Sequence, residues 1–426
     1  MLYERWQQVV AEKKNEIALR DLSCGRSWTF AQLNAAAAAV RLEKAVLVHP
    51  QGNSPEFIFT VLRAWRAGAV VCPLDAQHPP LTLTQPLPPG CCQLKTTPAS
   101  MGLPRTVAFT EAQLAADAEN IIATMGLQAG WPNLGVISLA YSYGFSNLVL
   151  PLLLHGIPLF LAPSPLPLAL RCAERAHGHL TLAGVPALWH AWHKGGAILR
   201  NVRLAISAGA PLPLSLERAV HEEHGLKIHN FYGSTECGGI AYDATETPRT
   251  EEASVGRPLK NVRVEAEARG GLRVRSQAVG QTFWPVPEPA LAGGTFLTRD
   301  LGAIRSGEVC LHGRMDDHIN VAGRKVSPTT IEQALREHGA VAECVVFGVP
   351  SGNPGRMDLI VACVAADRPS SRDELKQFLL ARLPGWQVPR EWWFVKNISS
   401  NGAGKPLRTQ WRQSYLEYRA RQAQTK

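Results

Sequence analysis

Short apolar runs alternate with amphipathic segments through the first half of this chain, and this alternation limits the folds open to it. Residues 45–49 form an apolar run typical of a buried strand, residues 55–67 have helical spacing, and residues 69–73 are apolar again. Strands that alternate with helices predict a parallel sheet covered by helices. Further helices are predicted at 111–125, 147–154 and 214–224, and further strands at 134–140, 203–207 and 228–232. We therefore predict an α/β fold.

The pattern changes after residue 254, where short segments of alternating polarity predict a small β-barrel up to residue 309. An α+β tail follows from about Asp316, with two predicted helices and two predicted strands. A chain of 426 residues is too long for one ordinary core. We predict a large N-terminal domain of α/β subdomains plus barrel over 1–315, and a small, mobile α+β C-terminal domain over 316–426.

The charge and composition exclude several classes of protein. A net charge of +9 suits an anionic ligand or an acidic partner, but no Lys/Arg cluster interleaves with aromatic residues, so nucleic acid is not favoured. The apolar run at 147–170 contains five prolines, which predicts core and not a membrane span. Residues 1–19 lack the apolar region of a signal peptide, and nine cysteines without a CxxC pair indicate reduced thiols. We expect a cytoplasmic protein.

Four motifs follow one another along the chain. They are NFYGSTE at 230–236, TRDLG at 298–302, GRMDDHIN at 313–320 and NGAGKPLR at 401–408. Their types and order resemble the adenylate-forming superfamily, which includes acyl- and aryl-CoA ligases, adenylation domains of peptide synthetases and luciferases. The resemblance extends over nearly the whole chain and implies an N-terminal AMP-binding domain and a C-terminal domain that carries a catalytic lysine.

The first motif combines a glycine, two hydroxyl residues and a carboxylate. Gly233 allows close approach of a ligand to the backbone, Thr235 offers a hydroxyl to a phosphate, and Glu236 offers an oxygen to Mg²⁺. Taken alone, the heptapeptide also fits an ordinary strand end followed by a turn.

The resemblance assigns roles to residues of the other motifs. Lys405 would bridge the substrate carboxylate and the α-phosphate of ATP, and Arg314 would support the ribose or the phosphates. Asp300 would accept both ribose hydroxyls, although it also fits a turn aspartate. Tyr232 would stack on adenine. The loop at 207–211 would run along the adenine, with Gly209, Ala210 and Pro211 as its contact residues; a plain strand-to-helix turn is the alternative.

Two further roles concern movement of the C-terminal domain. The resemblance makes Asp316 the hinge about which that domain rotates between adenylation and thiol transfer. Gly323 would line the tunnel for the thiol arm, although the sequence around it also fits a β-turn.

The segment TTPASMGLPR at 96–105 stands where the superfamily has its phosphate-binding loop, and it departs from the family pattern. Pro98 removes a backbone donor, Ala99 replaces a glycine, and Met101 replaces a hydroxyl residue. Weakened handling of ATP is therefore predicted. The residues that would still contact the phosphates are Thr97, Ser100 and Arg105.

The segment AYSYGFS at 140–146 stands where the superfamily begins its acid-binding pocket. It has no aspartate of the kind that holds an α-amine in amino-acid-activating relatives. We therefore expect an aryl, arylacrylic or medium-chain acid without an α-amine, although each aromatic side chain could instead be core. The predicted pocket residues are Tyr141, Tyr143, Phe145, Val185, Ser207 and Gly233.

Together these features predict an ATP-dependent acid–thiol ligase. It would use ATP and Mg²⁺ to form an acyl-AMP and then pass the acyl group to CoA or to the phosphopantetheine of an acidic carrier protein. A homodimer is left open. The alternative is a non-catalytic relative that binds a nucleotide or acyl group and acts as a partner protein, which the altered phosphate loop favours and the retained Thr235, Glu236, Asp300 and Lys405 oppose.

One histidine-containing segment is set aside. His221-Glu222-Glu223-His224 resembles a zinc-binding helix, but its histidines are spaced i,i+3, whereas metalloproteases use i,i+4. We interpret these histidines as surface or core residues.

Overall fold

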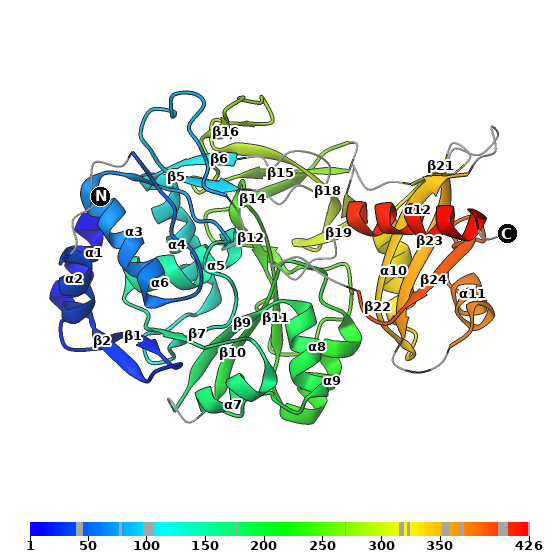
Figure 1. The fold of residues 1–426 in the computed structure, drawn as a ribbon, viewed down its shortest axis with the longest axis horizontal. Helices are drawn as coiled ribbons and strands as arrows, with labels where there is room; N and C mark the ends of the chain where they lie inside the picture. The colour runs from blue at the N-terminus through cyan, green and yellow to red at the C-terminus, as the bar shows by residue number, and fades with distance from the viewer. Residues whose placement is uncertain are drawn as a thin grey trace.

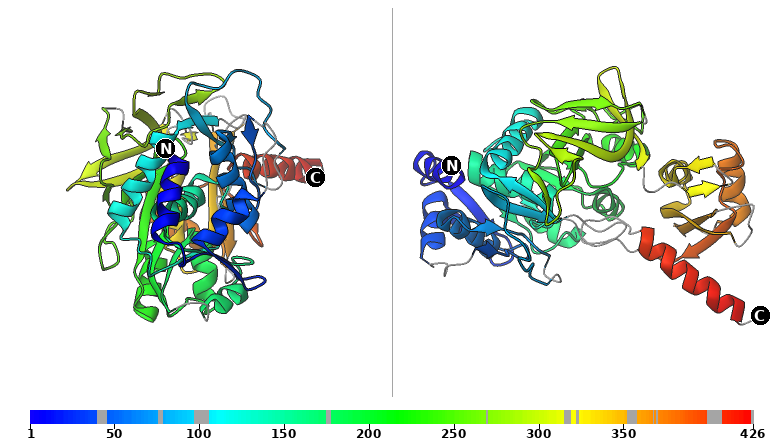
Figure 2. Two further views of the ribbon diagram at one scale, coloured as in Figure 1. Left: turned by 90° about the vertical axis from the view of Figure 1, so that its left-hand side faces the viewer. Right: turned by 90° about the horizontal axis from the view of Figure 1, so that it is seen from above.

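The computed structural model confirms the predicted α/β fold class. Figure 1 shows a large body made by the first three quarters of the chain, and a smaller body made by the remainder. The same two bodies are separate when the molecule is turned (Figure 2). The structure describes residues 1–39, 46–75, 79–96, 106–174, 178–268, 270–314, 319–321, 324–351, 358–366, 368, 370–398 and 408–424.

The largest sheet has nine strands, and its centre is parallel. The strands of this centre are buried, as expected for a sheet covered on both faces. Antiparallel strands close both edges. In spatial order the strands are β13 (Arg257–Pro258), β12 (Gly238–Tyr242), β11 (Ile228–Ser234), β10 (Val202–Ser207), β9 (Leu180–Gly184), β7 (Asn133–Gly135), β8 (Leu159–Leu161), β1 (Ile17–Asp21) and β2 (Arg26–Thr29).

A second sheet of five strands packs beside the first. Its order is β16 (Thr282–Trp284), β6 (Thr106–Thr110), β5 (Cys91–Thr96), β4 (Val70–Val71) and β3 (Leu47–Val48). Strands β3, β4 and β5 are parallel, whereas β6 and β16 are antiparallel to their neighbours. This arrangement brings residues 282–284, far along the chain, against the strand that begins at Thr106.

Sequence-encoded caps fix several of the helices around these sheets. Thr29 with Gln32, and Thr110 with Gln113, form capping boxes that begin α2 and α4. Gly68 ends α3 in the left-handed conformation that favours glycine. The helices of this body are α1 (Leu2–Glu12), α2 (Phe30–Ala38), α3 (Pro55–Ala67), α4 (Glu111–Met125), α5 (Ser142–Gly144), α6 (Leu150–His155), α7 (Pro167–Glu174), α8 (Pro186–Lys194) and α9 (Leu214–His224).

The predicted barrel region forms an antiparallel sheet with a long hairpin. The hairpin strands are β18 (Thr295–Arg305) and β19 (Glu308–Arg314). The hairpin turn is Ser306-Gly307, and both residues have positive φ, which fits the twist of a two-residue hairpin. The other strands of this sheet are β14 (Arg263–Ala266), β15 (Gly271–Arg275) and β17 (Leu291–Ala292).

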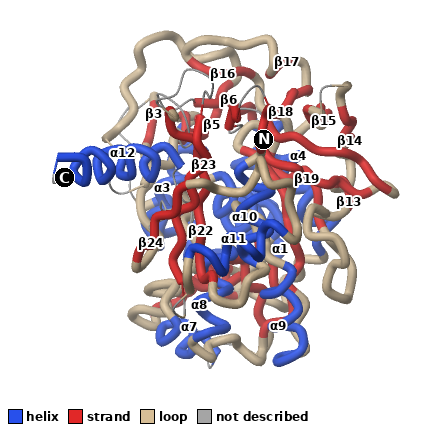
Figure 3. The backbone as a smooth tube through the Cα atoms, turned by 90° about the vertical axis from the view of Figure 1, so that its right-hand side faces the viewer, coloured by secondary structure: helices blue, strands red, loops and turns tan. Residues whose placement is uncertain are grey.

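The C-terminal body has its own hydrophobic cores, distinct from the core of the large body. Figure 3 shows its three-stranded sheet from the C-terminal side. Ser327 Oγ donates to the carbonyl of His312 at 3.1 Å, so this body contacts the end of β19. Its elements are β20 (Ile319–Val321), β21 (Arg324–Val326), α10 (Pro328–Arg336), β22 (Val341–Pro350), β23 (Asp358–Ala366), α11 (Arg372–Leu380), β24 (Glu391–Val395) and α12 (Arg408–Gln424).

Two local predictions were wrong in detail. The expected strand at 134–140 is the short β7, Asn133–Gly135. The expected helix at 147–154 begins earlier, at Ser142, and includes a π-helical turn, η1 (Phe145–Val149). Its side chains are buried, so the segment is core, as predicted. Across the described residues, no helix combines the length and apolar character needed to cross a membrane.

Candidate functional site

Side chains from three of the predicted motifs meet beside the end of β11. The hydroxyl of Tyr232 donates to Oδ2 of Asp300 at 2.6 Å, and Nε of Arg314 lies 3.2 Å from Oδ1 of the same carboxylate. Glu236 follows on the same turn as the end of β11, and its carboxylate interacts electrostatically with both Arg314 and Asp300. We call Tyr232, Glu236, Asp300 and Arg314 the carboxylate corner.

The register of the β18–β19 hairpin explains why Asp300 meets Arg314. Strand pairing begins at Arg305 opposite Glu308 and proceeds one residue at a time until Gly302 faces Leu311. The register then shifts, so that Leu301 faces Gly313 and Asp300 faces Arg314. Such a β-bulge re-aims side chains near functional sites. The bulge therefore places the two charged groups directly opposite each other.

Glu236 is a half-buried carboxylate whose desolvation outweighs the groups that stabilise its charge, among them a backbone hydrogen bond. Burial raises its pKa, while the Ser234 hydroxyl and the Arg314 charge oppose that rise. Among the described residues it forms no ion pair within 4 Å. A desolvated carboxylate next to a hydroxyl residue, Thr235, suits a hard divalent cation such as Mg²⁺. The donor set therefore fits the predicted metal role of Glu236.

The loop after β10 supports the predicted contact with a flat ring. Gly209 is exposed and has φ +87, a conformation that favours glycine. Ala210 is half-buried and Pro211 is exposed, so the loop presents small side chains at the surface. At Gly233 the constraint is internal, because an added Cβ would lie 2.6 Å from the carbonyl oxygen of Gly238.

A buried polar network behind the corner was missed at the sequence level. Asp117 accepts from the Ser146 hydroxyl at 2.6 Å and from the Gly239 amide at 3.0 Å. Nζ of Lys95 lies 3.8 Å from Asp117 Oδ2 and donates to Ser146 Oγ at 3.4 Å. Burial lowers the pKa of Lys95, and its attraction to Asp117 opposes that shift. This Lys95 network joins β5, α4 and η1 to the start of β12, just after the turn that contains Glu236.

One signal could have revealed Asp117. It lies on the apolar face of α4, between the buried residues Leu114 and Ile121. A charged residue at a core position needs a partner inside the protein. The partner could not be identified from spacing, because Lys95 and Ser146 come from other elements.

The aromatic side chains among the predicted pocket residues differ in their surroundings. Tyr141 donates to Asp75 at 3.0 Å, and burial together with Asp75 raises the pKa of Tyr141 to about 12. Tyr143 donates to the carbonyl of Ile206 at 3.3 Å. Phe145 lies in the core against Phe57, so we correct its predicted place in the pocket. The acid-binding set that we retain is Tyr141, Tyr143, Val185, Ser207 and Gly233.

Ser207 and Val185 lie at the ends of the parallel strands β10 and β9, where open α/β sheets bind ligands. The Ser207 hydroxyl is buried and has no hydrogen-bond partner among the described residues. It could therefore accept or donate a hydrogen bond to a bound group. The partner of Tyr141, Asp75, was not predicted from the sequence.

Several predicted residues lie outside the described part of the chain. Their roles stay predictions from the resemblance. They are Thr97, Ser100 and Arg105 of the phosphate loop, the hinge Asp316, the tunnel residue Gly323 and the catalytic Lys405.

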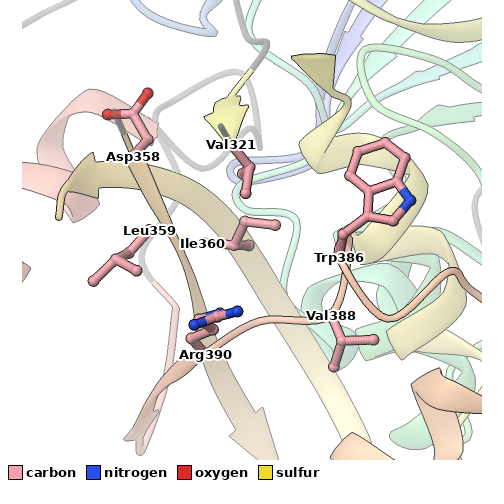
Figure 4. A pocket seen from close by; sticks show the side chains of 7 residues that line it. All are labelled: Val321, Asp358, Leu359, Ile360, Trp386, Val388 and Arg390. Atoms are coloured by element: carbon pink, nitrogen blue, oxygen red, sulfur yellow. The ribbon is translucent and has the colours of Figure 1, made fainter. Parts of the chain in front are cut away.

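A small hollow in the C-terminal body is unrelated to the corner. Val321, Ile360, Trp386 and Val388 line it, with Asp358 and Arg390 at its edge (Figure 4). Its walls are mainly apolar and include residues of the local hydrophobic core. Its lining contains none of the predicted nucleotide-binding residues, so we assign it no part in the predicted reaction.

Comparison with known proteins gives the same assignment as the motifs. The family of AMP-binding enzymes matches residues 91–281, and the C-terminal domain of AMP-binding enzymes matches residues 330–405. A feruloyl-CoA synthase of Amycolatopsis is 26% identical over 76% of this chain and 70% of its own. An anthranilate–CoA ligase of Pseudomonas aeruginosa is 28% identical over 76% of this chain and 67% of its own.

The fold also matches a solved structure over nearly its full length. The o-succinylbenzoate CoA synthetase of Bacillus subtilis, solved with its acyl-adenylate intermediate, has a TM-score of 0.81 at 19% identity, and the match covers 96% of this chain and 97% of that protein. Because both family models match in order and both relatives align over 76% of the chain, the protein belongs to the AMP-binding enzymes of the adenylate-forming superfamily and is a ligase of that superfamily.

Proposed function

We propose that the protein joins a carboxylic acid without an α-amine to a thiol in two steps. The acid attacks the α-phosphate of ATP and pyrophosphate leaves, which gives an acyl-AMP. The thiol then attacks the acyl carbon and AMP leaves, which gives a thioester. The observation that carries this proposal is the meeting of Tyr232, Asp300 and Arg314 next to Glu236.

The corner suits the ribose end of a nucleotide. Asp300 Oδ2 accepts from Tyr232 and Oδ1 faces Arg314, and each carboxylate oxygen can accept more than one hydrogen bond. Tyr232 and Arg314 therefore hold the carboxylate in one orientation and leave it able to accept from two hydroxyls. Fixed charges of this kind lower the cost of positioning a substrate.

Phosphate chemistry would occur at the adjoining turn. Glu236 would hold Mg²⁺, which neutralises phosphate charge when bound, and Thr235 would donate to a phosphate oxygen. Lys405 would approach the α-phosphate and the acid from the C-terminal domain. Rotation about Asp316 would later withdraw Lys405 and bring Gly323 to the thiol path.

The acid is proposed to be aryl, arylacrylic or medium-chain acyl. Tyr141 and Tyr143 both use their hydroxyls inside the protein, so their rings are held for apolar contact. The feruloyl-CoA and anthranilate–CoA relatives support an aryl acid. The Ser207 hydroxyl is free to contact a polar substituent of that acid.

The acceptor is proposed to be CoA or the phosphopantetheine of a carrier protein. Both are anionic, and the net charge of +9 suits either of them. The named CoA ligases support CoA. An assay with free CoA and with a loaded acidic carrier protein, each offered separately, decides between them.

The test is acid-dependent pyrophosphate exchange with hydroxamate trapping over a panel of aryl and aliphatic acids. We expect exchange with at least one aryl acid, and a loss of about 100-fold or more in Lys405→Ala. Lys396→Ala is the matched control, since Lys396 is an exposed lysine a few residues earlier in the chain. Equal activity of both variants would contradict the role of Lys405.

The alternative is a nucleotide- or acyl-binding partner protein without turnover. The altered phosphate loop at 96–105 favours it. AMP binding by calorimetry, combined with no exchange across the whole panel, would support this alternative over the enzyme.

A further inference from the structure

Helices α8 and α9 bring three metal-ligating side chains together on the large body, away from the corner. His193 lies in the last turn of α8, while Glu223 and His224 lie in the last turn of α9. Figure 1 shows the two helices side by side at the lower edge of this body. One ligand atom from each of the three side chains lies within 4.8 Å of the others.

The distances within this group fit a shared cation. His193 Nδ1 lies 3.5 Å from Glu223 Oε2, and His224 Nε2 lies 3.6 Å from Glu223 Oε1. Ligand bonds of about 2.0–2.2 Å in a tetrahedral zinc site place neighbouring ligand atoms roughly 3.3–3.5 Å apart. Each measured distance is close to that spacing, although the two involve different oxygens of Glu223. The exposed Glu223 side chain would therefore bind the ion through both oxygens, or rotate to place one oxygen near both histidines.

The environment of His193 supports a ligand more than a simple ion pair. Its Nδ1 atom is buried and has no hydrogen-bond partner among the described residues. A surface ion pair with Glu223 would contribute little and would need a protonated imidazole. Two neutral imidazoles and one carboxylate form a set that zinc and neighbouring transition metals accept, with a fourth position open to water.

We propose that His193, Glu223 and His224 bind a divalent transition-metal ion, with Zn²⁺ as the best match. The ion would fasten the end of α8 to the end of α9. The other ends of these helices follow Val185 of the acid-binding set and the loop that contains Gly209. The metal would therefore stiffen the support of both regions without touching substrate. This inference does not depend on the proposed reaction.

A further contact connects α8 to strand β10 beside the acid-binding set. Trp189 of α8 is buried and donates from Nε1 to the carbonyl of Ile206 at 3.2 Å, next to Ser207. Helix α8 is thus already bonded to β10 near its start. A metal ion bound to His193, at the C-terminal end of α8, would hold the helix at a second position and so define its direction.

The experiment uses the full chain with any affinity tag removed, because a histidine tag would bind the same ions. Calorimetric titration with Zn²⁺ should give one equivalent, and Co²⁺ should give the visible absorption of a tetrahedral site. His193→Ala and His224→Ala should each weaken Zn²⁺ binding by more than about 10-fold, since even loss of an outer partner costs 10–100-fold. Zn²⁺ should also raise the Tm of the wild type and leave that of His193→Ala unchanged.

His221→Ala and Glu222→Gln are the matched controls, because these residues flank the cluster on α9 but are not part of it. Both should bind Zn²⁺ like the wild type. The inference is overturned if the wild type binds no Zn²⁺, or if the folded His193→Ala and His224→Ala proteins bind it as tightly as the wild type does. Equal weakening in the His221→Ala control would also overturn it, since that outcome places the ion elsewhere.

Discussion

The carboxylate corner and the acid-binding set are built in opposite ways, although both depend on strand β11 and its neighbours. In the corner, a tyrosine hydroxyl from β11 and charged groups from β18 and β19 contact one another across two sheets. In the acid-binding set, Tyr141 and Tyr143 turn their hydroxyls to Asp75 and to a backbone carbonyl, and their rings remain for apolar contact. The corner is suited to a constant ligand, whereas the acid-binding set is suited to selection among acids.

This difference predicts two kinds of mutational effect. A change in the corner should lower activity by the same factor for every acid, because the nucleotide is common to all reactions. A change in the acid-binding set should alter the ranking of acids and leave the KM for ATP nearly constant.

The largest effect is expected for Asp300→Ala. The variant loses the proposed acceptor of two ribose hydroxyls and leaves Tyr232 and Arg314 without their shared partner. Hydrogen bonds to a charged group contribute about 1.5–3 kcal/mol each, so kcat/KM should fall by about 100-fold or more. Pyrophosphate exchange with an aryl and an aliphatic acid measures this. A loss of kcat/KM with only one of the two acids would contradict the assignment of Asp300 to the nucleotide.

The second-largest effect is expected on the free energy of unfolding, when the Lys95 network behind both regions is broken. Asp117→Asn leaves the buried Lys95 without its carboxylate partner, and breaking a buried ion pair typically costs about 3–5 kcal/mol. Denaturant unfolding should show this loss. The double variant Lys95→Met/Asp117→Asn should recover most of it, because it removes the unpaired charge and keeps an amide oxygen that can accept from the Gly239 amide. A double variant as unstable as Asp117→Asn would contradict the assignment.

A moderate and selective effect is expected for Tyr141→Phe. Loss of the hydroxyl removes the hydrogen bond from Tyr141 to Asp75 and should change the kcat/KM ratio between a hydroxylated and an unsubstituted aryl acid by about 10-fold. Because the pKa of Tyr141 is about 12, the phenol stays protonated at ordinary assay pH, so this ratio should not vary between pH 6 and 9. An unchanged ratio would remove Tyr141 from the acid-binding set.

A smaller effect is expected from repair of the phosphate loop. Ala99→Gly with Met101→Thr restores backbone freedom and a hydroxyl at the positions where this chain departs from the family pattern. The KM for ATP should fall several-fold, roughly the contribution of one hydrogen bond, while the ranking of acids should not change. Steady-state kinetics at varied ATP measures this. An unchanged KM would show that these positions do not contact ATP.

The smallest effect is expected far from both regions, at His155. Burial, followed by the Arg5 charge, lowers the pKa of His155 from 6.5 to about 4. Between these values the unfolded chain binds more protons than the folded one, so stability decreases as the pH falls through this window. His155→Gln should flatten the dependence of Tm on pH there and leave kcat/KM for all acids unchanged. A dependence as steep as that of the wild type would contradict the lowered pKa.

The sequence predicted those features that local pattern controls. The α/β class is confirmed, and the helices predicted at 111–125 and 214–224 are α4 and α9, because each segment has apolar periodicity and is followed by a left-handed glycine, Gly126 or Gly225. The π-helical turn at Phe145–Val149 was not predictable, since such turns depend on packing and function more than on residue preference.

The candidate site was predictable only in part, for the same reason. Motif order identified Asp300 and Arg314, but their contact requires the bulge that shifts the hairpin register. Asp117 and Asp75 were missed because their partners are distant in the chain. The grouping of His193 with Glu223 and His224 was not predictable, because these residues come from two helices.

The β18–β19 hairpin also offers a route for coupling between the carboxylate corner and the C-terminal body. Its second arm carries Arg314 at one point and, two residues earlier, the carbonyl of His312 that accepts from Ser327 of the C-terminal body. A rotation of that body that carried His312 with it would also move Arg314, the cation facing Asp300. By thermodynamic reciprocity, filling the corner with nucleotide would then bias the orientation of the C-terminal body by the same free energy.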